Sequence, residues 1–183
     1  MIDGLDSEAY ALVLQEWQSF LTTPIAASIA GANSAVPITD LARQRIYRKY
    51  RRVVKDGKYL LRHTEDVKLH ALRLECKKLR YLLEFFTSLF PPKEMSRLIR
   101  QLKRLQDNLG EFTDLTVQQF HLLDIATELP VGDPRTRQAL VATGALVQEL
   151  ARRQQHVKDD FAKTFSRFAA PANQKAFRKL FAD

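Results

Sequence analysis

The sequence has little of what cross-linking or membrane insertion requires. Its one cysteine, Cys76, cannot form a disulfide within the chain, and the flanking Glu75 and Lys77 are typical of a helix interior. We expect Cys76 to be a packing residue. The longest stretch of low polarity, residues 24–37, is too short to cross a bilayer, and the chain starts without a basic signal region. These absences favour a cytoplasmic protein that makes no contact with a membrane.

Motifs of catalysis and of metal binding are missing as well. We find no Gly-rich phosphate loop, no metalloprotease His-Glu pair and no nucleophile elbow. The nearest neighbours of His70 on its helix face are Arg73 and Lys77, which would repel a metal ion. A further His-carboxylate cluster is typical of a solvated helix face and consists of Asp114, Gln118, His121, Asp124 and Glu128. We therefore expect no catalytic residue, no metal and no cofactor.

Positive charge is what the sequence has in excess, and it is concentrated in one segment. The chain carries a net charge of +8, yet residues 43–104 alone hold 19 Lys and Arg against 6 Asp and Glu, a net charge of +13. The remaining residues carry a net charge of −5. Like charges one helical turn apart repel each other, so this segregation costs stability that a polyanionic partner would restore.

The apolar residues follow the 3.6-residue period of an α-helix, and strand-like alternation is absent. The pattern predicts an all-α fold, an antiparallel helical bundle with an additional long C-terminal helix. The predicted helices cover residues 7–21, 41–58, 67–89, 93–109, 112–129, 135–168 and 173–181.

The boundaries of these helices follow from proline, glycine and capping residues. Thr39 and Asp40 offer a cap, Pro91 and Pro92 separate two helices, and Gly110 is expected to separate two more. Residues 22–40 are expected to form a loop or crossover, although a short helix there is an alternative. The length of 183 residues is that of a single domain, which we place at residues 1–183.

Basic residues gather on one side of three predicted helices, as steps of about 100° per residue show. These stripes consist of Arg45, Arg48, Arg52 and Lys55; of His70, Arg73, Lys77 and Arg80; and of Arg97, Arg100 and Arg104. A single basic stripe is usually an ordinary solvated face. Three in succession favour a binding surface, and arginine suits phosphate because its guanidinium group donates paired hydrogen bonds in one plane.

Two sequence motifs resemble those of the CHAD family, the conserved-histidine α-helical domains. The segments LHALR at residues 69–73 and KKLRYLLE at residues 77–84 are similar to its signature helix. The segment LKRLQDNLGEFTDL at residues 102–115 resembles the helix, glycine and aspartate that follow in that family. Residues 46–60 are similar to the family's basic helix, and Tyr10, Leu14, Trp17 and Leu21 fit the helix before it.

The resemblance implies a non-catalytic helical module that binds inorganic polyphosphate in a basic groove. Carried over by position, the expected ligand contacts are Arg45, Lys49, Arg52, Lys55, His70, Arg73, Lys77, Arg80, Arg97, Arg100 and Arg104.

The motifs correspond mainly to the second, C-terminal repeat of the family. No counterpart of the first repeat's His-Arg helix precedes residue 40. Three alternatives follow: the chain is a fragment that lacks the first repeat, two copies associate as a homodimer to rebuild the groove, or a half-module binds on an open face.

Two other functions fit the same basic faces. A general polyanion-binding or nucleic-acid-binding module is compatible with the pI of about 9.7, although no helix-turn-helix pattern and no aromatic stacking platform are found. Nonspecific nucleic-acid binding at low salt is expected in either case. The third function is docking of an acidic protein partner.

Overall fold

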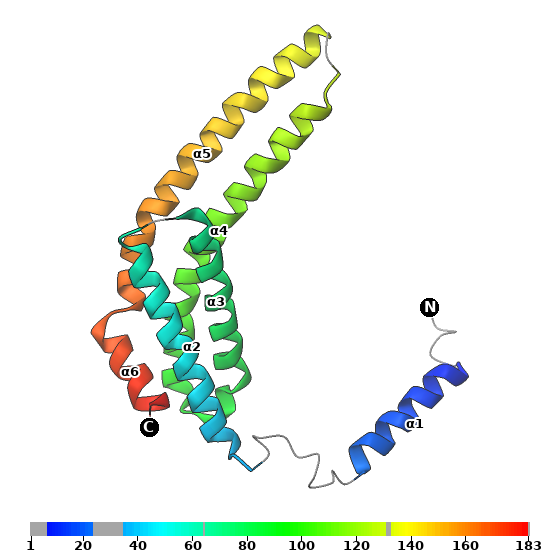
Figure 1. Cartoon of the computed structure of the whole chain (residues 1–183), viewed down its shortest axis with the longest axis vertical. Coiled ribbons are helices and arrows are strands. Elements are labelled where there is room, and N and C mark those ends of the chain that lie inside the picture. The colour runs from blue at the N-terminus through cyan, green and yellow to red at the C-terminus, as the bar shows by residue number, and fades with distance from the viewer. Residues whose placement is uncertain (1–6, 24–34, 64, 131–132, 183) are drawn as a thin grey trace. The chain divides into compact units, whose positions relative to one another are not determined.

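The computed structural model describes residues 7–23, 35–63, 65–130 and 133–182, and all of its regular elements in these ranges are helices (Figure 1). They are α1 (Glu8–Thr22), α2 (Ile38–Leu60), α3 (Asp66–Phe85), the 3-10 helix η2 (Thr87–Leu89), α4 (Pro92–Glu128), α5 (Pro134–Phe168) and α6 (Pro171–Phe181). The predicted all-α, bundle-like fold is confirmed. Of the crossover expected over residues 22–40, residues 24–34 lie outside the described ranges.

The chain divides into two compact units, Met1–Pro37 and Ile38–Asp183. The described part of the first unit is α1, which Ser7 caps by accepting a hydrogen bond from the Tyr10 amide at 3.3 Å. Trp17 and Phe20 stack on this helix, with ring centroids 5.7 Å apart. The sequence prediction of this helix is therefore confirmed to within one residue at each end.

The second unit is a bundle of helices around a core of leucine and phenylalanine. Each helix turns one apolar stripe inward, as the 3.6-residue period predicts, and Cys76 is one of the fully buried residues. Helix α5 packs into the core through the buried side chains of Phe161, Phe165 and Phe168. The ring of Phe177 on α6 stacks on the ring of Tyr50, with ring centroids 3.8 Å apart. Burying one such side chain contributes about 1.5–3 kcal/mol, so the phenylalanines fix α6 and α5 against α2.

The predicted helix break at Gly110 is wrong, because α4 runs without interruption from Pro92 to Glu128. A glycine inside a helix costs only about 1 kcal/mol relative to alanine. Burial of Leu109, Phe112 and Leu115 on either side of Gly110 outweighs that cost. The absence of a side chain at Gly110 leaves space beside Arg73, whose Nε would lie 3.9 Å from an added Cβ.

The other helix ends follow proline and capping residues. Pro92, Pro134 and Pro171 each occupy a first-turn position, where the missing amide proton costs nothing. Two predicted boundaries are wrong. The helix expected to reach residue 89 ends at Phe85 and is followed by η2, and α2 begins at Ile38, ahead of the expected cap.

The longest helices, α4 and α5, run side by side beyond the ends of α2 and α3 (Figure 1). Polar contacts join them: the Asn108 side chain donates to the Val157 carbonyl at 2.9 Å, and Arg153 pairs with Glu111 at 2.6 Å. The described helices include none with both the length and the apolar character that a membrane crossing needs.

Candidate functional site

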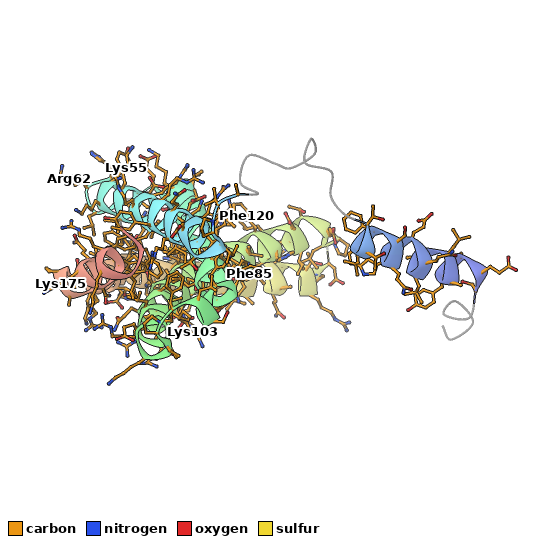
Figure 2. All side chains as sticks on the ribbon, turned by 90° about the horizontal axis from the view of Figure 1, so that it is seen from below. Lys55, Arg62, Phe85, Lys103, Phe120 and Lys175 are labelled. Atoms are coloured by element: carbon orange, nitrogen blue, oxygen red, sulfur yellow. The ribbon has the colours of Figure 1, made fainter. Side chains whose placement is uncertain are left out.

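Members of the three predicted basic stripes line different pockets of the bundle. In Figure 2, Lys55 of α2 and Lys103 of α4 lie on opposite sides of the bundle, with Lys175 of α6 on a third side. The reason is geometric, since each stripe lies opposite the apolar face of its own helix and those faces all point to one core. The stripes therefore form separate surfaces, and each has its own neighbours.

The stripe on α3 lines a groove against α4, which we call the α3/α4 groove. It is formed by Arg73, Lys77, Arg80, Gln106, Asp107, Gly110 and Asp114, and its volume is about 390 Å³. Its three cations are spaced by four and three residues, so they repeat about every 5–6 Å along the helix. All three are half-buried, and Arg73 lies beside Gly110 of α4.

Two buried polar atoms of this groove have no hydrogen-bond partner among the residues that the structure describes. One is Nε of Arg80, which lies 3.3 Å from Glu84 Oε1 but outside hydrogen-bonding geometry. The other is Oε1 of Gln106, a residue only 8% exposed. Leaving a buried polar group unpaired costs about 1–3 kcal/mol, so the groove gains stability when a ligand supplies the missing partners.

Two carboxylates also line the α3/α4 groove, but neither neutralises its cations. Asp107 and Asp114 are exposed, and no ion pair joins them to a basic group within the described ranges. Arg73 and Lys77 likewise form no ion pair with any described residue. Arg73 and Lys77 are therefore available to an external anion, whereas Arg80 also pairs with Glu84.

The contact between α2 and α3, which we call the α2/α3 seam, behaves differently. Here Lys49 donates to Glu75 Oε2 at 2.7 Å, and Arg52 lies 3.6 Å from the same oxygen. The Glu75 side chain is 13% exposed. Partial burial raises the pKa of its carboxyl group, but hydrogen bonds and charges from Lys49 and Lys78 outweigh that effect and hold the pKa below its usual value.

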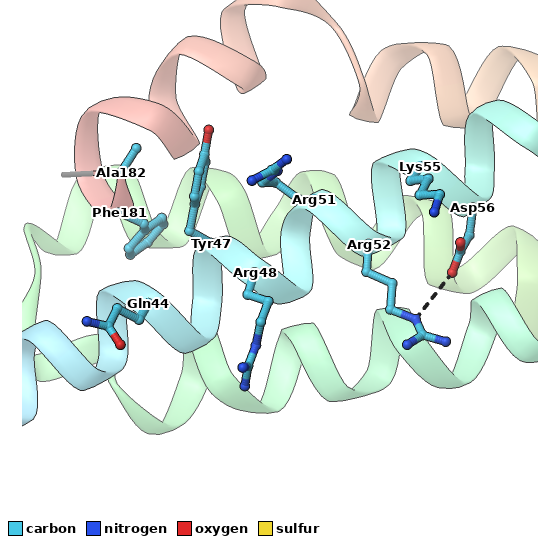
Figure 3. A pocket seen from close by; sticks show the side chains of 9 residues that line it. All are labelled: Gln44, Tyr47, Arg48, Arg51, Arg52, Lys55, Asp56, Phe181 and Ala182. Atoms are coloured by element: carbon cyan, nitrogen blue, oxygen red, sulfur yellow. Dashed lines mark ion pairs between the residues drawn. The ribbon is translucent and has the colours of Figure 1, made fainter. Parts of the chain in front are cut away.

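The outer face of α2 carries the remaining basic residues of that helix. Arg48, Arg52 and Lys55 line an open pocket, where Arg52 also pairs with Asp56 at 3.6 Å (Figure 3). In Figure 3, Arg48 and Arg52 point away from the side of α2 on which α6 lies. Arg45 is exposed and does not line that pocket.

The stripe on α4 lies apart from both surfaces. Arg97 lines a pocket toward α6 together with Lys93, Lys175 and Lys179, and Glu94 lies among them. Arg100 and Arg104 are exposed. His70 is exposed one turn before Arg73, outside the lining of the α3/α4 groove. Of the eleven predicted contacts, the α3/α4 groove thus brings together Arg73, Lys77 and Arg80, and the other eight are not part of its lining.

Sequence reasoning missed several residues of these surfaces. Gln106 is a polar residue at an apolar position between Leu102, Leu105 and Leu109, and that mismatch was the available signal. Asp107 of α4 lines the same groove as the cations of α3, a neighbour that spacing along one helix does not reveal. On α6, Lys175, Arg178 and Lys179 follow helical spacing, which could have been read as a fourth basic stripe.

Three other features of the described ranges bear on metal binding and on reactive side chains. No group of three or more His, Cys, Asp or Glu side chains could hold a metal ion there. The Cys76 thiol is fully buried, and burial raises its pKa, which makes it a packing residue rather than a nucleophile. The polar cluster on α4, from Asp114 to Glu128, is exposed at each of its five positions, as expected of a solvated face.

Comparison with known proteins agrees with the motifs. A comparison with curated proteins finds no match. The family model of the CHAD domain matches residues 1–123, more than half of the chain and the part that includes the α3/α4 groove. The chain belongs to the CHAD domain family.

Proposed function

We propose that this protein binds inorganic polyphosphate without chemically altering it, and that the α3/α4 groove is its main contact. The observation that carries the proposal is a combination of two features: Arg73 and Lys77 form no ion pair with described residues, and two buried polar atoms, Arg80 Nε and Gln106 Oε1, have no hydrogen-bond partner among them. Family membership supports the same ligand class.

The charge pattern of the groove suits an extended polyanion. Cations about 5–6 Å apart on one rigid helix favour a ligand that carries a negative charge on every repeat unit. A phosphate oxygen would accept from Arg80 Nε, and such charge-assisted bonds contribute about 1.5–3 kcal/mol each. Half a turn of the Gln106 amide would bring its NH₂ group to the place now held by Oε1, where it too can donate.

Polyphosphate is favoured over a nucleic acid because the groove has no side chain on which a base could stack. Its lining contains no aromatic residue. Asp107 and Asp114 are exposed at the groove, and their negative charges also disfavour docking of a broad anionic surface such as the face of an acidic protein. The remaining basic surfaces would attract any polyanion at low salt without shape discrimination.

Calorimetric titration tests this proposal. Long-chain polyphosphate and duplex DNA of equal phosphate content are titrated into the protein at physiological salt and again at raised salt. We expect polyphosphate to bind more tightly and to keep that preference as salt increases, because shaped hydrogen bonds are screened less than surface charges. Equal affinities that fall together with salt would show a generic electrostatic surface and contradict the proposal.

A further inference from the structure

A second cluster of cations lies in the cleft between α2 and α6, which we call the α2/α6 cleft. Its lining consists of Tyr47, Tyr50, Arg51, Val54, Lys55, Lys58, Gln174 and Arg178. The volume of about 360 Å³ is in the range of small-molecule sites. Figure 3 shows Arg51 and Tyr47 pointing to the side of α2 on which α6 lies, so the cleft opens on a different face from the α3/α4 groove.

The cleft holds four basic side chains and no carboxylate. Within the described ranges, Arg51, Lys55, Lys58 and Arg178 form no ion pair, and all four are exposed. Two of them come from successive turns of α2, so their mutual repulsion is not relieved by the protein itself. An anion that entered the cleft would meet four uncompensated positive charges.

The floor of the cleft carries a hydroxyl group that lacks a partner. Tyr50 is 5% exposed, and its OH has no hydrogen-bond partner. Stacking on Phe177 at 3.8 Å holds its ring in place. Burial raises the pKa of Tyr50 to about 12, so the hydroxyl stays protonated and can donate near neutral pH. Arg178 lines the same cleft as Tyr50, and its positive charge lowers the pKa of this hydroxyl against the larger effect of burial.

We propose that the α2/α6 cleft is a second anion site that takes a short oligophosphate, with a triphosphate as the chemical class. A triphosphate carries several negative charges over a short length, and its oxygens accept from arginine, lysine and the phenol alike. The triphosphate could be free or be the tail of a nucleotide, and the Tyr47 ring at the edge of the cleft is available to a base. This site does not depend on the α3/α4 groove.

Titration of the whole chain with inorganic triphosphate and, separately, with a metal-free nucleoside triphosphate tests the inference. Binding of either ligand supports the inference and identifies whether the site takes free triphosphate or a nucleotide. Tighter binding of the nucleotide would indicate an additional contact to its base. Binding of neither would overturn it while leaving the polyphosphate proposal standing.

Two variants locate the site. The cleft variant, Arg51→Ala with Lys58→Ala and Arg178→Ala, changes exposed residues and should weaken triphosphate binding at least about tenfold. Its control, Arg137→Ala with Lys163→Ala and Arg167→Ala, removes the same charge from exposed, unpaired positions of α5 outside the cleft. Equal affinities of the two variants would overturn the site.

Tyr50→Phe removes only the hydroxyl group and keeps the stacking on Phe177. We expect the triphosphate affinity to fall about threefold to tenfold, because one hydrogen bond to a charged oxygen is lost. The melting temperature should stay the same or rise, because an unpaired buried hydroxyl is removed. Unchanged affinity in this folded variant would overturn the role of the phenol. Arg73→Ala with Lys77→Ala and Arg80→Ala should leave triphosphate binding intact, which separates this inference from the proposed function.

Discussion

The α3/α4 groove and the α2/α3 seam are built from the same residue types on neighbouring helix faces, but their cations are in different states. In the seam, Glu75 accepts from Lys49 at 2.7 Å and lies near Arg52. In the groove, Arg73 and Lys77 form no ion pair with described residues, and Arg80 Nε is buried without a hydrogen bond. A basic stripe therefore indicates a ligand site only where the fold leaves its charges uncompensated.

Replacing one lysine by alanine in the groove and one in the seam tests this comparison. These two variants should differ most in polyphosphate affinity. Lys77→Ala should weaken polyphosphate binding about tenfold, the loss of one charge-assisted hydrogen bond, with little change in stability. Lys49→Ala should leave affinity nearly unchanged but lower the free energy of unfolding by about 1 kcal/mol, because Glu75 loses its closest partner. Calorimetry and chemical denaturation measure the two effects, and equal loss of affinity in both variants would remove the distinction.

Glu75→Gln sharpens the comparison because it removes the negative charge that pairs with the cations of the α2/α3 seam. Lys49 would then be without an ion-pair partner among the described residues, like Arg73 and Lys77 in the groove. Freed from Glu75, Lys49 and Arg52 should raise polyphosphate affinity about twofold to fivefold, a modest gain at a partly exposed position. Titration of the variant against the wild type measures this gain. A loss of affinity would mean that Glu75 positions ligand contacts rather than neutralising them.

The same carboxyl group predicts a pH dependence of stability. Its pKa is lowered in the folded protein from an ordinary value of 4.5, so its contribution is complete above that value and is lost as the pH falls through the folded pKa. Denaturation at a series of pH values should show the stability difference between wild type and Glu75→Gln shrinking below about pH 4.5. A difference that stays constant down to pH 3 would contradict the lowered pKa.

Gly110→Ala gives the smallest effect. An added Cβ would meet Arg73 Nε at 3.9 Å, an ordinary contact, so the helix should gain about 0.5–1 kcal/mol from the better helix former. Polyphosphate affinity should change less than about threefold. Gly144→Ala is the matched control, since open space surrounds that position. Destabilisation by Gly110→Ala alone would show that the groove needs the glycine for space.

The fold was more accessible from the sequence than the site was. Helical periodicity predicted the all-α class, because apolar spacing reports directly on one helix face. The residues that flank Cys76 predicted its packing role, and Cys76 is fully buried. Sequence reasoning failed at Gly110, where local propensity predicted a break and the packing of Phe112 and Leu115 maintains a continuous helix. Such packing between helices cannot be read from the sequence of one helix alone.

The site was less predictable because charge compensation acts between helices. Spacing identified Arg73, Lys77 and Arg80 as one stripe, and the structure places all three in one groove. Spacing along α2 could not show that Glu75 of α3 would pair with Lys49. Nor could it show that Arg51 and Arg178, distant in sequence, would line one cleft.

The polyphosphate affinities of the wild type and of two variants matched to each other in charge test the central claim most directly. Wild type, the groove variant Arg73→Ala with Lys77→Ala and Arg80→Ala, and the α5 control variant are titrated with long-chain polyphosphate at physiological salt, after circular dichroism has established equal helicity. We predict that the groove variant loses at least about a hundredfold in affinity, while the control, which has the same net charge, stays within about threefold of the wild type. Equal losses in the two variants would contradict the account, because total charge and not the α3/α4 groove would then hold the ligand.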